Sequence, residues 1–116
     1  MIIKVLKSKI HRATVTEANL NYIGSISVDK ALLNAANLQE HEKVHVLDIT
    51  NGARLETYVI SSPENSGEIC INGAAAHLVN PNDKVIIVSY CGLEPNAARG
   101  HIPNIVHVDD DNKIIK

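Results

Sequence analysis

Short aliphatic runs, each ended by turn-forming residues, recur along the whole 116-residue chain. The clearest pair, residues 44–49 and 54–60, flanks Asn51 and Gly52, and Asn-Gly between two such runs is the strongest local signal of a β-hairpin. Other predicted strands share this β-favouring content, and they cover residues 2–6, 9–16, 68–71, 84–90, 105–108 and 113–115, together with a stretch at 20–28 that Gly24 interrupts. Many short strands with brief connections predict a mainly β fold, a small closed barrel, rather than a parallel sheet with crossover helices.

Short helices are predicted between some of these strands. Asp29 is a favourable N-cap for a helix over residues 31–36, and Asn37 could end that helix. Residues 72–79 are typical of a tight turn that opens a short helix, and residues 94–99 of one helical turn. Because the chain has no Trp and no Phe, its core must consist of Val, Ile, Leu and Ala, which favours a sheet. The length indicates one domain, residues 1–116.

Charge and composition argue against several functional classes. The net charge of -2 comes from scattered acidic and basic residues, so no basic stripe predicts a nucleic-acid partner. No apolar stretch is long enough to cross a membrane, and the lysine-interrupted N-terminus is unlike a signal peptide, so a cytoplasmic location is expected. Cys70 and Cys91 lack C-x-x-C spacing and are expected to be buried free thiols, while the histidines lack the spacing of a zinc site, so no metal is expected.

The pair Gly24-Ser25 has a possible chemistry beyond an ordinary turn. A serine hydroxyl can attack the carbonyl of the preceding residue if the backbone there departs from its usual conformation, and glycine tolerates unusual φ and ψ. The resulting ester can break by β-elimination, and the dehydroalanine that remains hydrolyses to a ketone. From the dipeptide alone a simple turn is the better interpretation, so the case depends on the residues around it.

Several separate motifs occur around this pair in a fixed order. They are Lys-Ile-His-Arg at 9–12, Asn-Tyr-Ile-Gly-Ser at 21–25, Thr-Asn-Gly at 50–52, Arg54, Thr-Tyr at 57–58 and Asn-Gly-Ala-Ala-Ala-His at 72–77. Together they resemble the pyruvoyl-dependent aspartate 1-decarboxylases over nearly the whole chain, with the likeness weakening after about Leu93.

This resemblance implies a six-stranded double-psi β-barrel and a cytoplasmic homo-oligomer, a homotetramer, that converts L-aspartate to β-alanine and CO2 for pantothenate synthesis. It also implies autocatalytic cleavage into residues 1–24 and 25–116, with Ser25 becoming the covalent pyruvoyl cofactor. The ketone would form a Schiff base with the substrate amine and accept the electrons released by decarboxylation.

The resemblance assigns further residues to the site. Tyr58 is the expected proton donor, and Thr57 is expected to contact substrate and to hydrogen-bond the cleavage-site carbonyl. Lys9 and Arg54 are the expected partners of the substrate carboxylates. Strand alternation places Arg54 and Tyr58 on one face, roughly 13 Å apart, and Thr57 on the other. A bent strand or a site shared between subunits would reconcile these roles.

The turn at Asn72 is the last predicted part of the site. Its backbone N–H groups at a helix N-terminus could bind an anion, although simple helix capping is the alternative interpretation. By the resemblance, the substrate-binding segment falls on Asn72, Gly73, Ala74 and Ala75, with His11 and Tyr22 as supporting residues.

Two alternatives remain open at the level of the sequence. One is an uncleaved, non-catalytic β-barrel that serves as an interaction module. The other is a pyruvoyl decarboxylase that acts on a different amino acid.

Overall fold

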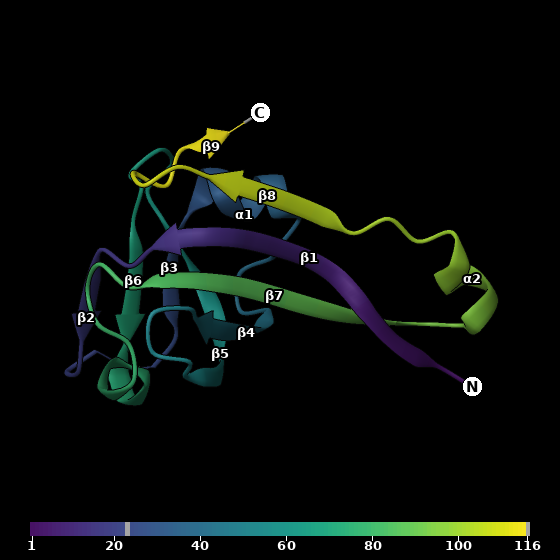
Figure 1. Cartoon of the computed structure of the whole chain (residues 1–116), viewed down its shortest axis with the longest axis horizontal. Coiled ribbons are helices and arrows are strands. Elements are labelled where there is room, and N and C mark those ends of the chain that lie inside the picture. Colours follow the sequence, from purple (N-terminus) through teal and green to yellow (C-terminus); the bar gives the residue numbers. More distant parts are fainter. Residues whose placement is uncertain (23, 116) are drawn as a thin grey trace.

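The protein is a mainly β molecule built around one mixed sheet. The computed structural model describes residues 1–22 and 24–115, so Ile23, which falls in the predicted stretch 20–28, lies outside the described residues. The sheet order is β2-β6-β3-β5-β4-β7-β1-β8-β9. The predicted mainly β class is confirmed (Figure 1).

Seven of the strands pair with one another in a continuous order. They are β1 (Ile3–Thr14), β2 (Glu17–Asn19), β3 (Ile26–Asp29), β4 (Lys43–Asp48), β5 (Arg54–Ser62), β6 (Ile69–Asn72) and β7 (Lys84–Leu93). The order runs from β1 through β7, β4, β5, β3 and β6 to β2, and only Val15 and Thr16 separate β2 from β1 in the chain. The two ends of this run of pairings, β1 and β2, are therefore adjacent in the chain, an arrangement consistent with a small β-barrel.

The first strand differs from its prediction. Residues 2–6 and 9–16 were expected as separate strands, but β1 is continuous and pairs along its length with β7. The register shifts between Leu6 and Ser8 and again between Ile10 and Ala13, so β-bulges absorb the irregular positions. The hydroxyls of Ser8 and Ser89 lie 2.9 Å apart inside the sheet, so these two buried polar groups hydrogen-bond to each other.

The predicted stretch at 20–28 is not one extended segment. β2 ends at Asn19 and β3 begins at Ile26, and the chain turns between them. The predicted interruption at Gly24 is confirmed, because both Gly24 (φ 29°) and Ser25 (φ 90°) have positive φ values that no strand can accommodate.

The hairpin predicted at Asn51-Gly52 is confirmed. β4 and β5 pair antiparallel, and Gly52 takes a φ of 78° in the turn. The strands predicted at 105–108 and 113–115 are also present, as the antiparallel pair β8 (Asn104–Val108) and β9 (Ile114–Ile115). β8 adds to the barrel by pairing in parallel with β1.

The helices are short, as expected. In α1 (Lys30–Ala36) the Asp29 side chain accepts a hydrogen bond from the Ala31 N–H, and Asn37 ends the helix in the left-handed conformation (φ 56°). The predicted turn after β6 is a 3-10 helix, η1 (Gly73–His77), and the last helix is α2 (Pro95–Arg99). Within residues 1–22 and 24–115, no helix has the length and apolar character of a membrane span.

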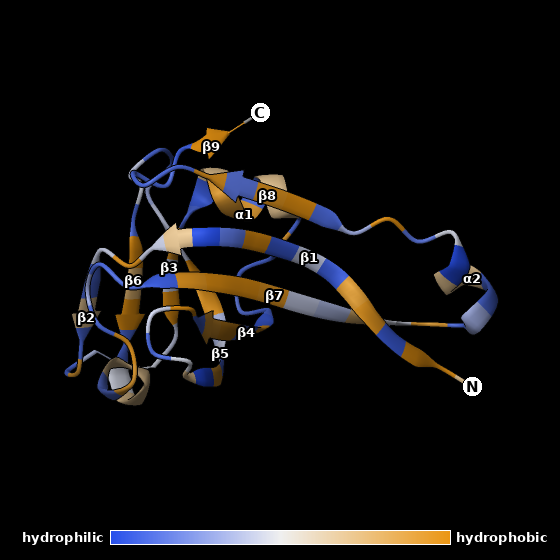
Figure 2. Cartoon of the chain, viewed as in Figure 1, coloured by the Kyte–Doolittle hydropathy of each residue, from blue (hydrophilic) through white to orange (hydrophobic). Residues whose placement is uncertain are grey.

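The core is aliphatic, as the composition requires. The apolar strands around it are visible in Figure 2. Its largest fully buried side chains belong to Ile10, Ile26, Leu32, Ile69, Ile71 and Ile87.

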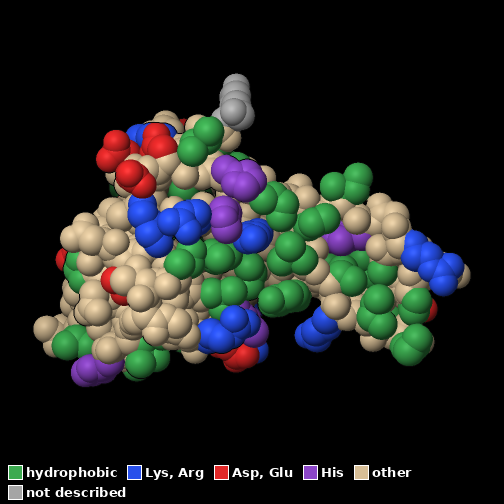
Figure 3. Space-filling view, in the orientation of Figure 1, with side chains coloured by type: hydrophobic (Ala, Val, Ile, Leu, Met, Phe, Trp, Pro, Cys, Tyr) green, Lys and Arg blue, Asp and Glu red, His purple; other side chains and the backbone are tan. Residues whose placement is uncertain are grey.

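An arm projects from the barrel. It consists of the first half of β1, the last half of β7, and α2 with its flanking segments, and it carries the N-terminus (Figure 1). Many hydrophobic side chains cover its surface in Figure 3. Among the residues of these segments, Ile2, Tyr90 and Ile102 are 59%, 44% and 86% exposed. Cys91 lies in this arm and is only half-buried, so the expectation that both thiols would be buried is wrong for Cys91.

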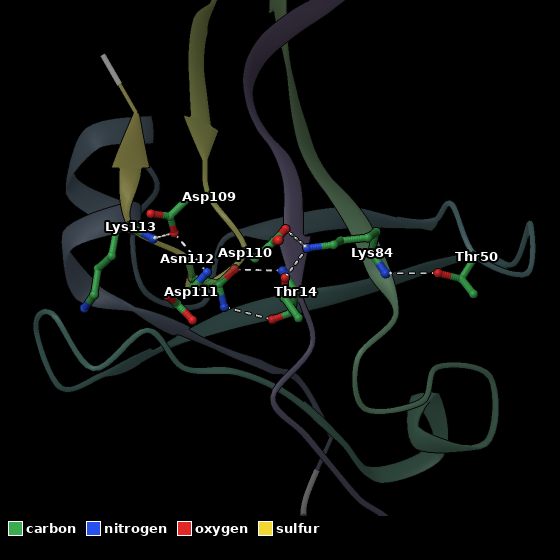
Figure 4. A network of polar contacts seen from close by, with 8 residues as sticks. All are labelled: Thr14, Thr50, Lys84, Asp109, Asp110, Asp111, Asn112 and Lys113. Carbon is green, nitrogen blue, oxygen red and sulfur yellow. Dashed lines mark hydrogen bonds and ion pairs between the residues drawn. The ribbon is translucent and has the colours of Figure 1, made fainter.

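The acidic turn before β9, residues 109–111, is held against the barrel by hydrogen bonds of the Asn112 side chain. This side chain accepts from the Thr14 N–H at 2.7 Å and donates to the carbonyls of Thr14 and Gly67 at 2.8 Å (Figure 4). Lys84 adds an ion pair to Asp110. The aspartates of this turn are exposed, whereas Asn112 beside them is buried.

Candidate active site

Gly24 and Ser25 lie in the turn between β2 and β3, at the end of the barrel away from the arm (Figure 1). Ser25 is 3% exposed and has a φ of 90°. A residue with a Cβ atom rarely adopts this conformation, which costs on the order of 1–3 kcal/mol and persists only where the surroundings enforce it. The bond expected to break is therefore buried and strained.

Asn72, at the end of β6, holds Ser25 from two sides. Its backbone N–H donates to the Ser25 carbonyl at 3.0 Å. Its side-chain Nδ2 contacts Ser25 Oγ at 3.4 Å and Ser27 Oγ at 3.0 Å. Asn72 is 2% exposed and occupies the N-cap position of η1, but its side chain makes no capping bond to that helix. Its side chain faces the serines instead.

Gly73 lets the next segment approach the Gly24 backbone. A Cβ atom at Gly73 would lie 2.8 Å from the Gly24 nitrogen, 2.9 Å from its Cα and 3.1 Å from the Tyr22 carbonyl oxygen. The φ of 67° also favours glycine here. The backbones of Gly73 and Gly24 therefore lie in close contact where the chain after β6 passes the turn.

A cavity of about 710 Å³ opens beside Ser25. Tyr58 reaches this cavity from β5, and its hydroxyl would lie 3.8 Å from a Cβ built on Gly24. The phenol is thus close to the Gly24-Ser25 bond and 37% exposed, a position from which it could exchange a proton. The described residues that line the cavity are Asn21, Tyr22, Ser25, His41, Tyr58 and Ile60.

His41 and Ile60 were not predicted as site residues. The His41 backbone N–H donates to the Val59 carbonyl at 2.7 Å, and its ring lies 6.2 Å from that of Tyr58. This contact joins the loop after α1 to β5, and no local sequence signal indicates such a pairing. Ile60 follows from strand alternation once Tyr58 is placed, since the two residues are neighbours on one strand face.

Nine predicted site residues are absent from the described lining of this cavity: Gly24 and residues 72–75 around the turn, and four residues on the strands. Lys9 and His11 lie on β1, and Arg54 and Thr57 on β5. Arg54 and Tyr58 are exposed and Thr57 is half-buried, which agrees with the predicted alternation along a regular strand. The roles of these four residues stay predictions. A site shared between subunits is the arrangement that would bring them to the cavity.

His11 sits in a group of cationic side chains on β1 and β8. Its Nδ1 is buried without a hydrogen-bond partner among the described residues, and its ring meets that of His107 edge to face at 5.5 Å. Burial, Lys9, His107 and Arg12 together lower the pKa of His11 below its ordinary value. These surroundings favour the neutral form of the His11 imidazole.

The remaining predicted residues surround the turn. Tyr22 is 52% exposed and lines the cavity. Ala74 is exposed, whereas Ala75 packs against the core within η1. A small ketone made from Ser25 fits this place, because the serine side chain already borders an open cavity while its backbone is held by Asn72.

Cys70 lies close to the same turn, on β6. Its Sγ is 3.1 Å from Asn72 Oδ1, and it forms a group with Glu17 and Glu68 whose potential metal-ligand atoms lie within 4.8 Å of one another. Burial and the two carboxylates raise the pKa of Cys70 to about 11. The thiol is thus protonated at neutral pH. Glu17 comes from β2, so the spacing of residues in the sequence could not reveal it, whereas Glu68 and Asn72 lie two residues from Cys70 on either side.

The fold and this site define a small β-barrel-like protein with a strained Gly-Ser bond beside a tyrosine. The sequence model of the family described as aspartate decarboxylase matches residues 1–115, and the chain belongs to that family. Similar proteins named aspartate 1-decarboxylase include one from Caldicellulosiruptor saccharolyticus, which is 61% identical over all of this chain and 91% of its own. Others come from Corynebacterium efficiens (62% identical, covering 99% of this chain and 85% of that protein) and Clostridium botulinum (59%, covering 100% and 91%).

Proposed function

We propose that this protein decarboxylates L-aspartate to β-alanine and CO2, using a pyruvoyl group made from its own Ser25. The family membership and the names of its relatives support the reaction. The single observation that carries the self-processing is the buried Ser25, held at a positive φ by Asn72 next to Gly24. The β-alanine would serve pantothenate synthesis, and the cytoplasm is the proposed location.

The first step is internal to the chain. Ser25 Oγ attacks the Gly24 carbonyl, the C–N bond breaks, and an ester to Oγ replaces the amide. Loss of the Ser25 Cα proton and cleavage of the Cβ–Oγ bond then leave Gly24 as a carboxylate that carries Oγ away. Water hydrolyses the remaining dehydroalanine to a ketone and ammonia. Backbone strain at Ser25 lowers the barrier because the attack relieves it.

Once formed, a pyruvoyl ketone supplies an electrophile for the substrate amine and a sink for electrons. The residues of this chain would bind and protonate the substrate around it. Tyr58, which borders the cavity, would deliver a proton to the former α-carbon. Lys9 and Arg54 would hold carboxylate groups, with Thr57 and residues 72–75 completing the substrate site.

Because Lys9, His11 and Arg54 lie outside the described lining of the cavity, we propose that neighbouring copies share each site. A homo-oligomer, with the homotetramer as the specific expectation, would bring these side chains from one copy to the Ser25 of another. The exposed apolar arm offers a surface for that association.

Intact-mass spectrometry of the purified protein tests the proposal. We expect two fragments, residues 1–24 and 25–116, with a pyruvoyl cap on the second, and β-alanine release from aspartate. Ser25→Ala should remain one chain and be inactive because the nucleophile is gone. A folded wild-type chain that stays intact would instead favour the non-catalytic interaction module. Cleaved protein that ignores aspartate but releases CO2 from another amino acid would favour the other alternative.

Tyr58→Phe separates processing from turnover. The variant should still cleave, since the attacking group is Ser25, but kcat should fall by about 10²-fold or more if the phenol is the general acid. An uncleaved Tyr58→Phe chain would contradict this role.

A further inference from the structure

The side chain of Asn72 can face Ser25 with either end of its amide. The neighbouring hydroxyls of Ser25 and Ser27 do not decide which end, because a hydroxyl both donates and accepts. Cys70 is the third group in contact with this amide, with Sγ 3.1 Å from Oδ1. Its other sulfur contacts, to Glu17 Oε2 and the Ile71 carbonyl, are longer at 3.9 and 4.0 Å.

A protonated thiol favours one of the two orientations. An S–H group donates to an oxygen, whereas sulfur is a weak acceptor for an N–H. Burial beside Glu17 and Glu68 keeps this thiol protonated, since each carboxylate disfavours a thiolate and raises the pKa of Cys70. Oδ1 therefore turns to Cys70, and Nδ2 turns to the serines.

We propose that Cys70 is a positioning residue for self-cleavage, which orients the Asn72 amide so that Nδ2 donates to Ser25 Oγ. This inference rests on the proposed function and adds a residue to it. Oγ is the atom that departs as part of the Gly24 carboxylate, so negative charge develops on it when the Cβ–Oγ bond breaks. An N–H donor already aimed at Oγ stabilises that charge, whereas a carbonyl oxygen aimed there would repel it.

Two substitutions at Cys70 separate orientation from packing. Cys70→Ala removes the donor, and Cys70→Ser keeps a donor in a slightly smaller side chain. We expect Cys70→Ala to slow cleavage about tenfold, as loss of one orienting hydrogen bond implies, and Cys70→Ser to restore the rate to within about threefold. Cys91→Ala, at the thiol in the arm, is the matched control and should cleave at the wild-type rate.

The fraction of cleaved chain over time is measured by intact mass, alongside the melting temperature of each variant. If Cys70→Ala and Cys70→Ser slow cleavage equally, or if Cys70→Ala cleaves at the wild-type rate, the positioning role is overturned. Rescue by serine at a melting temperature equal to that of Cys70→Ala would exclude simple packing as the cause.

A second readout does not depend on cleavage. In the uncleavable Ser25→Ala background, the Asn72 side-chain amide should give one sharp pair of NMR signals, held by Cys70 and Ser27. Adding Cys70→Ala should broaden or double that pair, and adding Cys70→Ser should restore it. Unchanged signals in all three chains would overturn the orienting contact. If wild-type protein fails to cleave, the proposed function fails, while these signals still decide whether Cys70 orients Asn72.

Discussion

Gly73 and Gly52 both adopt positive φ values, of 67° and 78°, but only Gly73 faces another segment of backbone. A side chain at Gly52 would meet nothing within 4 Å, whereas one at Gly73 would overlap the backbone of Gly24. Comparing substitutions at the two glycines therefore distinguishes the effect of a strained φ from the effect of displacing the cleavage site.

Gly73→Ala should impair self-cleavage strongly. We expect Gly52→Ala to lose about 1 kcal/mol of unfolding free energy and to cleave normally. Gly73→Ala should lose about 2–4 kcal/mol and cleave at least tenfold more slowly, because its Cβ must push Gly24 aside. Denaturant unfolding of both variants in the Ser25→Ala background, with intact mass in the wild-type background, measures the two effects. Equal cleavage rates for the two variants would contradict the role given to Gly73.

At the scale of elements, the turn between β4 and β5 rests on a pair of buried acids. Asp48 and Asp83 are 3% and 7% exposed. Asp48 Oδ1 accepts from the backbone N–H groups of Thr50 and Asn51, while the buried Oδ2 has no hydrogen-bond partner among the described residues. Burial and the neighbouring Asp83 raise the pKa of Asp48 to about 6, so one proton is held by the pair in mildly acidic solution.

This pair should make stability depend on pH. Because the folded pKa of Asp48 lies above its unfolded value of 3.8, its stabilising contribution is fully present below about pH 4 and is lost as pH rises through about 6. The loss should reach about 3 kcal/mol at most. Asp83→Asn removes the repulsion and should flatten this slope in urea unfolding between pH 4 and 8. Asp111→Asn, on the exposed turn, is the control; a slope that survives Asp83→Asn would refute the pairing.

The elements that could be predicted from the sequence are those with local causes. Asp29 and Asn37 bound α1 through their own caps, and Gly52 supplies the positive φ of its turn. β1 could not be predicted as one strand, because its bulges are stabilised by β7, which is far away in sequence. The same limit applies to the site: Gly24-Ser25 was predicted, but the contacts of Cys70 with Glu17 and of His41 with Tyr58 depend on neighbouring strands and loops.

At the scale of the whole molecule, the arm predicts self-association. Ile102 is 86% exposed on it, and burying an isoleucine contributes about 1.5–3 kcal/mol. Ile102→Asp should therefore shift the protein toward smaller species in sedimentation velocity and reduce decarboxylation, if sites are shared between copies. Ile114→Asp, at an exposed isoleucine on β9, is the matched control. Wild-type protein that is monomeric yet active would rule out shared sites.

The two strands that flank the turn with Gly24 and Ser25 both pair with the same strand, β6. β2 pairs with β6 in parallel, and β3 pairs with β6 antiparallel. A cut after Gly24 would leave both new ends bound to the same intact strand, while β1 stays between β7 and β8. The native molecule should therefore tolerate its own scission. Refolding after denaturation should be affected by the cut, because two separate polypeptides must then associate. Refolding of cleaved protein should therefore be second order in concentration. Each Ser25→Ala subunit should fold at a rate independent of dilution, and only the later association of subunits should depend on concentration.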